Sequence, residues 1–291
     1  MKLGFRGLHP VSELIFYVFV LSFTLTSSHP VSLITGLVCA FLYDIRLRGK
    51  KAVSFSLKFV LPLIIASALI NGLFSHFGVT VLFTLPDGNN FTLEAVIYGL
   101  VFSLRAASSV IWLMSLNEVL TNDRILFLFG RFSPKTALVI SMSLRFIPLI
   151  SEQAEKISDA QKGIGALSAS DSIMSRLKSS AKRLSILVSW TLERGIDTAD
   201  SMRARGYGLK GRTSFNSYAF TVRDIMLSCL VISGAIVFVL TKNELTASYD
   251  PVISIPHPCV TGIVSSLLFT AIMLFPFIYD ILEERKWSIL K

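Results

Sequence analysis

Residues 93–117 read LEAVIYGLVFSLRAASSVIWLMSLN, and this stretch decides the fold class. It is mostly apolar and longer than the about 20 residues that a helix needs to cross a hydrocarbon core about 30 Å thick. In lipid, a backbone N–H or C=O group finds no water to bind, so each must be satisfied within its own segment. The stretch is therefore predicted to be a transmembrane helix.

The composition extends this prediction to the rest of the chain. Of the 291 residues, 52% are hydrophobic and only 16% are charged, whereas a soluble domain carries about 25% charged residues. Five further stretches are apolar enough to be candidate spans: 11–27, 30–45, 52–72, 225–241 and 260–281. We expect an all-α, polytopic membrane protein with about six transmembrane helices, together with long cytoplasmic amphipathic helices.

Arg105 lies midway along the stretch 93–117. A charged side chain at that depth is costly and normally faces protein, which makes Arg105 a candidate functional residue. The alternative is a structural role, in which Arg105 binds a carbonyl or carboxylate group of a neighbouring span. The sequence leaves both interpretations open.

Lysine and arginine gather in the loops on one side of these spans. The N-terminal segment, the loop 46–51 and the C-terminal tail are basic, whereas 24–31 and 73–91 have no lysine or arginine and 242–259 has only Lys242. Basic loops favour the cytoplasmic side. We therefore expect a multi-pass protein of the cell (plasma) membrane with both termini cytoplasmic. The external loop 73–91 is expected to hold a short hairpin, because 79–83 alternates weakly and 86–89 is typical of a turn.

The chain then divides into three parts: N-terminal membrane helices in 1–117, a cytoplasmic region in 118–224 and C-terminal membrane helices in 225–291. One long helix is predicted in the middle region from Pro134 to Gly165, because Ser133-Pro134 combines a capping residue with proline at the first helical position. Its first part, 133–151, is apolar enough to span, but a helix lying under the membrane agrees better with the charge pattern.

A second long helix is predicted from about Asp171 to Arg205. Its apolar residues recur at steps of three and four, close to the helical period. They are Ile173, Leu177, Ala181, Leu184, Val188, Thr191, Gly195, Ala199 and Met202. The opposite face is charged, so the helix is expected to be amphipathic.

This helix is followed by glycines that imitate nucleotide-binding motifs. Residues 206–211 fit G-x-G-x-x-G, but that motif needs a preceding strand and a following helix, and here a helix precedes. Gly206 is instead expected to end the helix in a left-handed cap.

The candidate motif at this helix end is Ala204-Arg205-Gly206. Small residues on either side let a partner approach, and the planar guanidinium of Arg205 suits a bidentate contact with a carboxylate. The alternative is an ordinary arginine that complements the helix dipole.

The order of these parts resembles the transmembrane T component of energy-coupling factor transporters, which import vitamins and transition-metal ions. The resemblance covers nearly the whole chain. It rests on His-Pro before each of the first two spans and on the blocks 71–74, 117–121, 144–148, 160–165 and 199–207. The last block, Ala-Asp-Ser-Met-Arg-Ala-Arg-Gly-Tyr, is the most specific.

The resemblance implies a non-catalytic subunit that works with two ABC ATPase subunits and a substrate-binding membrane S component. Family members carry two Ala-Arg-Gly motifs, each of which engages one ATPase. The second motif corresponds to Ala204-Arg205-Gly206. The first falls at Gly163-Ile164-Gly165, where isoleucine replaces arginine, and Lys162 is a candidate substitute for the charge.

The apolar upper face of the long helices is then expected to hold the S component. The contact residues that we expect on that face are Leu177, Leu184, Val188 and Ala199.

Other classes of function have weaker support. Three cysteines and four histidines stand far apart and fit no metal motif, so no metal, cofactor or nucleic-acid partner is expected. A membrane-embedded enzyme would need catalytic groups that converge on one face. A self-contained secondary transporter or channel would carry more polar residues in its spans or an internal repeat. Both remain alternatives.

Overall fold

The computed structural model describes residues 4–75, 78–84, 90–164, 173–209, 218–241, 247–249, 253–254 and 260–289. The chain divides into two compact units, which are described separately. Unit 1 comprises Met1–Ile125 and Tyr218–Lys291, and unit 2 comprises Leu126–Ser217.

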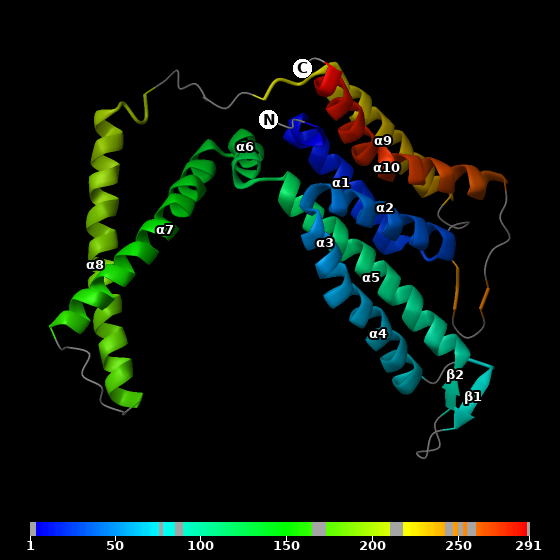
Figure 1. Cartoon of the computed structure of the whole chain (residues 1–291). Helices are drawn as coiled ribbons and strands as arrows, with labels where there is room; N and C mark the ends of the chain where they lie inside the picture. The colour runs from blue at the N-terminus through cyan, green and yellow to red at the C-terminus, as the bar shows by residue number, and fades with distance from the viewer. Residues whose placement is uncertain are drawn as a thin grey trace. The chain divides into compact units, whose positions relative to one another are not determined.

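Unit 1 is built from long apolar helices (Figure 1). Its helices are α1 (Pro10–Thr26), α2 (Pro30–Arg48), α3 (Lys50–Phe55), α4 (Leu61–Phe74), α5 (Leu93–Val119), α9 (Val222–Thr241) and α10 (Val260–Ile289). Short 3₁₀ (Phe5–Gly7) and π-helical (Ser56–Val60) segments accompany them. Helix α5 packs against α4, α2 and α1, while α9 packs against α1 and α10, and α10 also contacts α2.

The His-Pro pairs start the first two helices, as predicted. Pro10 and Pro30 occupy the first helical positions, where proline loses no hydrogen bond and its fixed φ suits the helix. The N–H of Val11 donates to Nδ1 of His9 at 3.2 Å, so His9 caps α1 through its ring. His29 occupies the corresponding position before α2 without a side-chain cap.

Six helices are long and apolar enough to cross a membrane, among the residues that the structure describes. They are Pro30–Arg48, Lys50–Phe74, Leu93–Val119, Pro134–Gly163, Val222–Thr241 and Val260–Lys286. The fold is therefore an all-α, polytopic membrane protein, as the sequence predicted. The set differs from the predicted one in two places. The helix at Pro10–Thr26 is shorter than this criterion requires, and Pro134–Gly163 meets it.

The N-terminal segment and the last helix meet at one end of unit 1. The N–H of Phe5 donates to Oδ1 of Asp280 at 2.5 Å, and Arg6 pairs with Glu118 at 3.5 Å. Arg46, near the end of α2, pairs with Glu284. The start of α1 and the ends of α2, α5 and α10 thus share this end, which we call the basic end.

The opposite end of unit 1 carries the expected hairpin. Strands β1 (Val81–Thr84) and β2 (Asn90–Thr92) pair antiparallel, with Val81 opposite Thr92 and Thr84 opposite Asn90. The predicted turn at 86–89 lies outside the described residues. The N–H of Thr80 donates to the Glu94 carboxylate, which joins the hairpin to α5.

Aromatic side chains form the core of unit 1. Trp112 of α5 is fully buried, with its ring centroid 5.9 Å from Phe16 and 6.2 Å from Tyr17. Tyr43 of α2 closes the cluster at 6.1 Å from Trp112. The Phe16 and Tyr17 rings meet Trp112 edge-on and the Tyr43 ring is tilted against it. Such aromatic pairs add directional stabilisation to the buried area, and these contacts join α1, α2 and α5.

Unit 2 contains two long helices, α7 (Pro134–Gly163) and α8 (Ile173–Ala204), which pack against each other (Figure 1). Both match the predicted helices to within two residues at each end. An open cavity of about 250 Å³ lies between them. Its lining residues are Ala154, Ile157, Ser180, Arg183, Leu184 and Leu187.

Two details of the predicted middle region were wrong or missing. Ser133 precedes Pro134 as expected, but its side chain makes no capping hydrogen bond; its backbone carbonyl instead accepts from the Thr136 hydroxyl at 2.9 Å. The sequence also missed α6 (Asn122–Phe132), which carries the chain from unit 1 into unit 2. This helix is amphipathic and too short to show as an apolar span.

Candidate functional site

The end of α8 has the geometry that the glycine predicted. Gly206 has φ +81°, in the left-handed region. Its N–H donates to the carbonyl oxygen of Arg203 at 3.0 Å, and the N–H of Tyr207 donates to that of Met202 at 3.0 Å. These two bonds define a Schellman motif, which satisfies the last carbonyls of the helix. The backbone around Arg205 is therefore fixed rather than frayed.

Arg205 itself is exposed, and Ala204 beside it is exposed as well. No described residue forms an ion pair with Arg205. Its neighbour Arg203 instead lies 3.7 Å from Asp200 across one helical turn. The guanidinium of Arg205 is thus presented on a rigid helix end between two small residues.

The end of α7 presents a different surface. Ile164 is 78% exposed, and Gly163 has no atom within 4 Å of the position that a Cβ would take. Lys162 is exposed, but its Nζ donates to Oδ1 of Asp159 at 2.9 Å. Gly165 lies outside the described residues. The charge of Lys162 is therefore paired with Asp159, whereas no residue in the described part of the chain pairs with Arg205.

The apolar side of α8 is exposed over most of its length. Leu177, Leu184 and Val188 are exposed, whereas Ala199 is half-buried. The sequence missed Leu192 and Ile196, which are also exposed and continue from Val188 in steps of four. Side chains four apart lie on one face of a helix, so this spacing was the signal that could have found them.

Arg105 of α5 binds Ser28, in the turn between α1 and α2. Its Nη2 donates to the hydroxyl of Ser28 at 2.7 Å, and the hydroxyl of Tyr249 donates to the backbone carbonyl of Ser28 at 2.9 Å. The partner is a serine hydroxyl rather than the expected carbonyl or carboxylate. Arg105 therefore connects α5 to the turn between α1 and α2.

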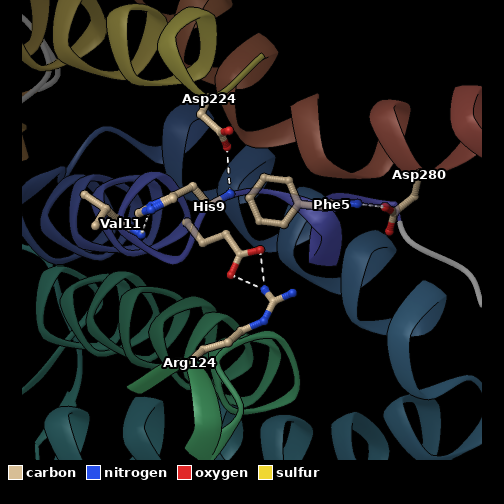
Figure 2. A network of polar contacts seen from close by, with 7 residues as sticks. Phe5, His9, Val11, Arg124, Asp224 and Asp280 are labelled. Atoms are coloured by element: carbon tan, nitrogen blue, oxygen red, sulfur yellow. Dashed lines mark hydrogen bonds and ion pairs between the residues drawn. The ribbon is translucent and has the colours of Figure 1, made fainter. Parts of the chain in front are cut away.

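The basic end also contains a buried polar network that the sequence did not predict. Glu13 of α1 is fully buried and accepts from Arg124 at 2.5 Å on both carboxylate oxygens. Close by, Oδ1 of the buried Asp224 accepts the N–H of His9 at 2.7 Å. Figure 2 shows both contacts around the start of α1. The partners are more than a hundred residues apart, so no local pattern reveals them.

No group of three or more histidine, cysteine, aspartate or glutamate residues able to hold a metal ion occurs in the part of the chain that the structure describes. The described features of the site are an arginine on a capped helix end, an exposed apolar helix face and a buried polar anchor.

These features define a polytopic helical membrane protein with a separate pair of long amphipathic helices. The profile of the family described as "CbiQ: Cobalt transport protein" matches residues 5–215. The chain belongs to this family, and the curated relatives that it matches are named as transmembrane proteins of energy-coupling factor transporters.

The curated relatives carry the name "Energy-coupling factor transporter transmembrane protein EcfT". The protein of Exiguobacterium sibiricum is 35% identical over 108 residues, which cover 37% of this chain and 41% of the relative. That of Listeria innocua is 41% identical over 101 residues, covering 34% and 37%. That of Bacillus subtilis is 34% identical over 105 residues, covering 35% and 40%. The chain thus matches about two fifths of the length of these relatives.

Proposed function

We propose that this chain couples two separate ABC ATPase subunits to a substrate-binding membrane S component that takes up a vitamin or a transition-metal ion. The observation that carries the proposal is the end of α8, where a Schellman motif holds the exposed Arg205 between Ala204 and Gly206. A helix end without bulky neighbours fits into a groove on another protein. The chain itself then needs no catalytic group.

Arg205 is proposed to bind a carboxylate in a groove of one ATPase. The guanidinium offers a planar fork that matches a carboxylate through two parallel hydrogen bonds, which lysine cannot reproduce. No residue that the structure describes forms an ion pair with Arg205, so binding would release this charge from none of them.

The second ATPase is proposed to contact the end of α7 at residues 162–165. Lys162 already donates to Asp159, and Ile164 is exposed in place of the family's arginine. We infer that this contact is more apolar than the one at Arg205 and that the two ATPase contacts are unequal.

The exposed apolar face of α8 is proposed to hold the S component through Leu177, Leu184, Val188 and Ala199. Leu192 and Ile196 extend this face. Apolar contacts are not directional, so a partner held in this way can tilt or exchange while it stays attached. Movement of the helix ends, driven by the ATPases, would then reach the S component along α7 and α8.

The proposed arrangement places residues 118–224 in the cytoplasm, between membrane helices in 1–117 and 225–291, with both termini cytoplasmic in the plasma membrane. Within unit 1, Lys50 and Lys51 at the α2–α3 junction and Arg285 and Lys286 near the end of α10 add to the charge of the basic end. Such an excess favours the cytoplasmic side.

The experiment compares Arg205→Ala and Arg205→Glu with Arg203→Ala as the matched control. Arg203 is an exposed arginine two residues away whose charge is paired with Asp200. Each variant is expressed with its partner subunits, and ATPase co-purification and substrate uptake are measured. We expect Arg205→Glu to lose more than Arg205→Ala, because it sets a negative charge against the proposed carboxylate, and Arg203→Ala to behave as wild type.

Intact assembly and wild-type uptake in both Arg205 variants would reject the proposal. A transport assay on the purified chain alone in liposomes distinguishes a coupling subunit from a self-contained transporter or channel. Solute movement without ATPases would favour a self-contained transporter.

A further inference from the structure

We propose that the five residues His9–Glu13 anchor both chain connections between unit 1 and unit 2, and that this anchor transmits the coupling movement. Glu13 and Arg124 are its positioning residues. The inference rests on the proposed coupling function and places the transmission of force away from the ATPase contacts.

The outgoing connection is fixed by a buried ion pair. Arg124 lies in the first turn of α6, where its own N–H donates to the carbonyl of Thr121 at 3.0 Å. Its side chain is 12% exposed, and Nη1 donates to both oxygens of Glu13, whose side chain is 0% exposed. Removal of one partner from such a pair leaves an uncompensated buried charge. Movement of the start of α6 away from α1 would therefore break this pair.

The returning connection is fixed by Asp224 in the first turn of α9. Its Oδ1 accepts the N–H of His9 at 2.7 Å, and its Oδ2 accepts the N–H of Thr221 at 2.8 Å and the Thr221 hydroxyl at 2.5 Å. The His9 ring adds edge-on contacts with Phe220 at 4.9 Å and Tyr218 at 6.4 Å. One carboxylate thus ties the N-terminal segment to the residues by which the chain re-enters unit 1.

The two attachments are close together on a rigid support. His9 and Glu13 are four residues apart, which is about 6 Å along a helix axis. Helix α1 beneath them is held by the buried rings of Phe16 and Tyr17 against Trp112. Figure 2 shows the Asp224 contact and the Arg124 contact approaching the start of α1 from different elements. Both connections are therefore held at a single narrow anchor.

The consequence is mechanical. The two chain connections, at Arg124 and at 218–224, give a force on unit 2 a covalent route to the membrane helices. If those residues are held rigidly, a displacement of α7 and α8 also moves the membrane helices. If those residues can move, the displacement changes only the connections. Loss of the Glu13–Arg124 pair is therefore expected to leave ATP hydrolysis intact and to lower the transport obtained from it.

The test uses the complete complex in liposomes and compares Glu13→Gln with Asp44→Asn. Asp44 pairs with Arg48, and the side chains of that pair are 0% and 13% exposed, almost the same burial as for Glu13 and Arg124. The Asp44–Arg48 pair lies within one helix, α2, and its hydrogen bonds join residues of that helix alone. We expect Glu13→Gln to lower uptake per ATP hydrolysed by about tenfold, a typical size for energetic coupling between sites. We expect Asp44→Asn to leave the ratio within about twofold of wild type.

A second measurement does not depend on transport. Amide hydrogen exchange of the purified chain should become faster in 121–132 for Glu13→Gln but not for Asp44→Asn. Arg124→Lys, which keeps the charge and loses the planar fork, should give an intermediate rate and remains available if Glu13→Gln does not fold.

Equal uptake ratios and equal exchange in Glu13→Gln and Asp44→Asn would overturn the inference. Failure of the wild-type chain to bind ATPases would instead reject the proposed function, and the exchange measurement would still decide whether His9–Glu13 anchors the connections.

Discussion

The N–H of Tyr207 donates to the carbonyl oxygen of Met202 at 3.0 Å. The exposed Arg205 lies between these two residues in the chain. The bond closes the helix only because Gly206, between them in the chain, adopts φ +81°. For a residue with a Cβ, this left-handed region costs about 1 to 2 kcal/mol. The direction of Arg205 therefore depends on its neighbour having no side chain.

Gly206→Ala should consequently weaken the end of α8 without altering any charge. We expect faster amide exchange at 203–207 and reduced retention of the ATPases, at a cost of about 1 to 2 kcal/mol in the local free energy of unfolding. Part of the strain also comes from Leu209, whose Cδ1 lies 3.0 Å from the position of the new Cβ. Hydrogen exchange with mass spectrometry measures the first effect and co-purification the second.

Gly195→Ala is the matched control on the same helix. Gly195 lies inside α8 with no atom within 4 Å of the place that a new Cβ would occupy, and alanine is favoured over glycine in a helix by about 1 kcal/mol. This variant should slow exchange in α8 and keep the ATPases. If both variants accelerate exchange at 203–207, the cap does not set the position of Arg205.

Local features were predictable from the sequence and distant ones were not. The Gly206 cap, the His-Pro helix starts and the pairing of β1 with β2 follow from residues within a few positions of each other. Glu13 and Arg124 stand 111 residues apart. Their pairing depends on how α1 packs beside α5, and hydropathy alone does not specify that. The short helix α6 was not predicted because its 11 residues are too few for a membrane span and are only partly apolar.

The contact between α4 and α5 depends on a second glycine. A Cβ on Gly99 would lie 2.8 Å from the backbone carbonyl oxygen of Ser67 and 3.0 Å from Cα of Ala68. Backbone atoms cannot rotate away, so Gly99→Ala should separate the two helices. Overpacking of this kind costs about 1 to 3 kcal/mol, and thermal unfolding in detergent measures the loss.

Gly36→Ala provides the comparison for this substitution. The nearest atoms to the new Cβ would be the Met273 sulfur and Cγ2 of Thr24, both at 3.8 Å, an ordinary van der Waals distance. We expect this variant to unfold close to the wild-type temperature. Equal destabilisation of the two variants would show that membrane-helix glycines tolerate no Cβ in this fold, whatever their contacts.

Arg105 and Ser28 should be energetically coupled. A hydrogen bond that involves a charged group contributes about 1.5 to 3 kcal/mol, and Nη2 of Arg105 donates to Ser28 at 2.7 Å. We expect Ser28→Ala and Arg105→Met each to lower stability, and the double variant to lose less than the sum of the two. A double-mutant cycle on thermal or denaturant unfolding measures this coupling. Strict additivity would show that Arg105 does not depend on Ser28, and would favour a functional role for its charge.

Whether α7 crosses the membrane depends on where the chain leaves unit 1 and where it returns to it. Arg124 leaves and Asp224 returns at the same end, because both bind the segment His9–Glu13. The number of membrane crossings between 125 and 217 must therefore be even. Helix α8 carries charges along its length, including Lys178, Lys182 and Arg194, and a span with so many charges is too costly. We therefore expect that α7 does not cross alone, although its length and hydropathy permit a crossing.

Cysteine labelling in intact cells tests this argument. In a background without native cysteines, single cysteines at Lys135 and Lys162, near the two ends of α7, should both resist a membrane-impermeant thiol reagent until the cells are opened. Lys51→Cys at the basic end should behave in the same way, and Val79→Cys in the loop before β1 should react from outside; these two report the orientation of unit 1. Labelling of one end of α7 from outside and the other only from inside would establish a crossing, and the even count would then require a second span in α8 that its charges oppose.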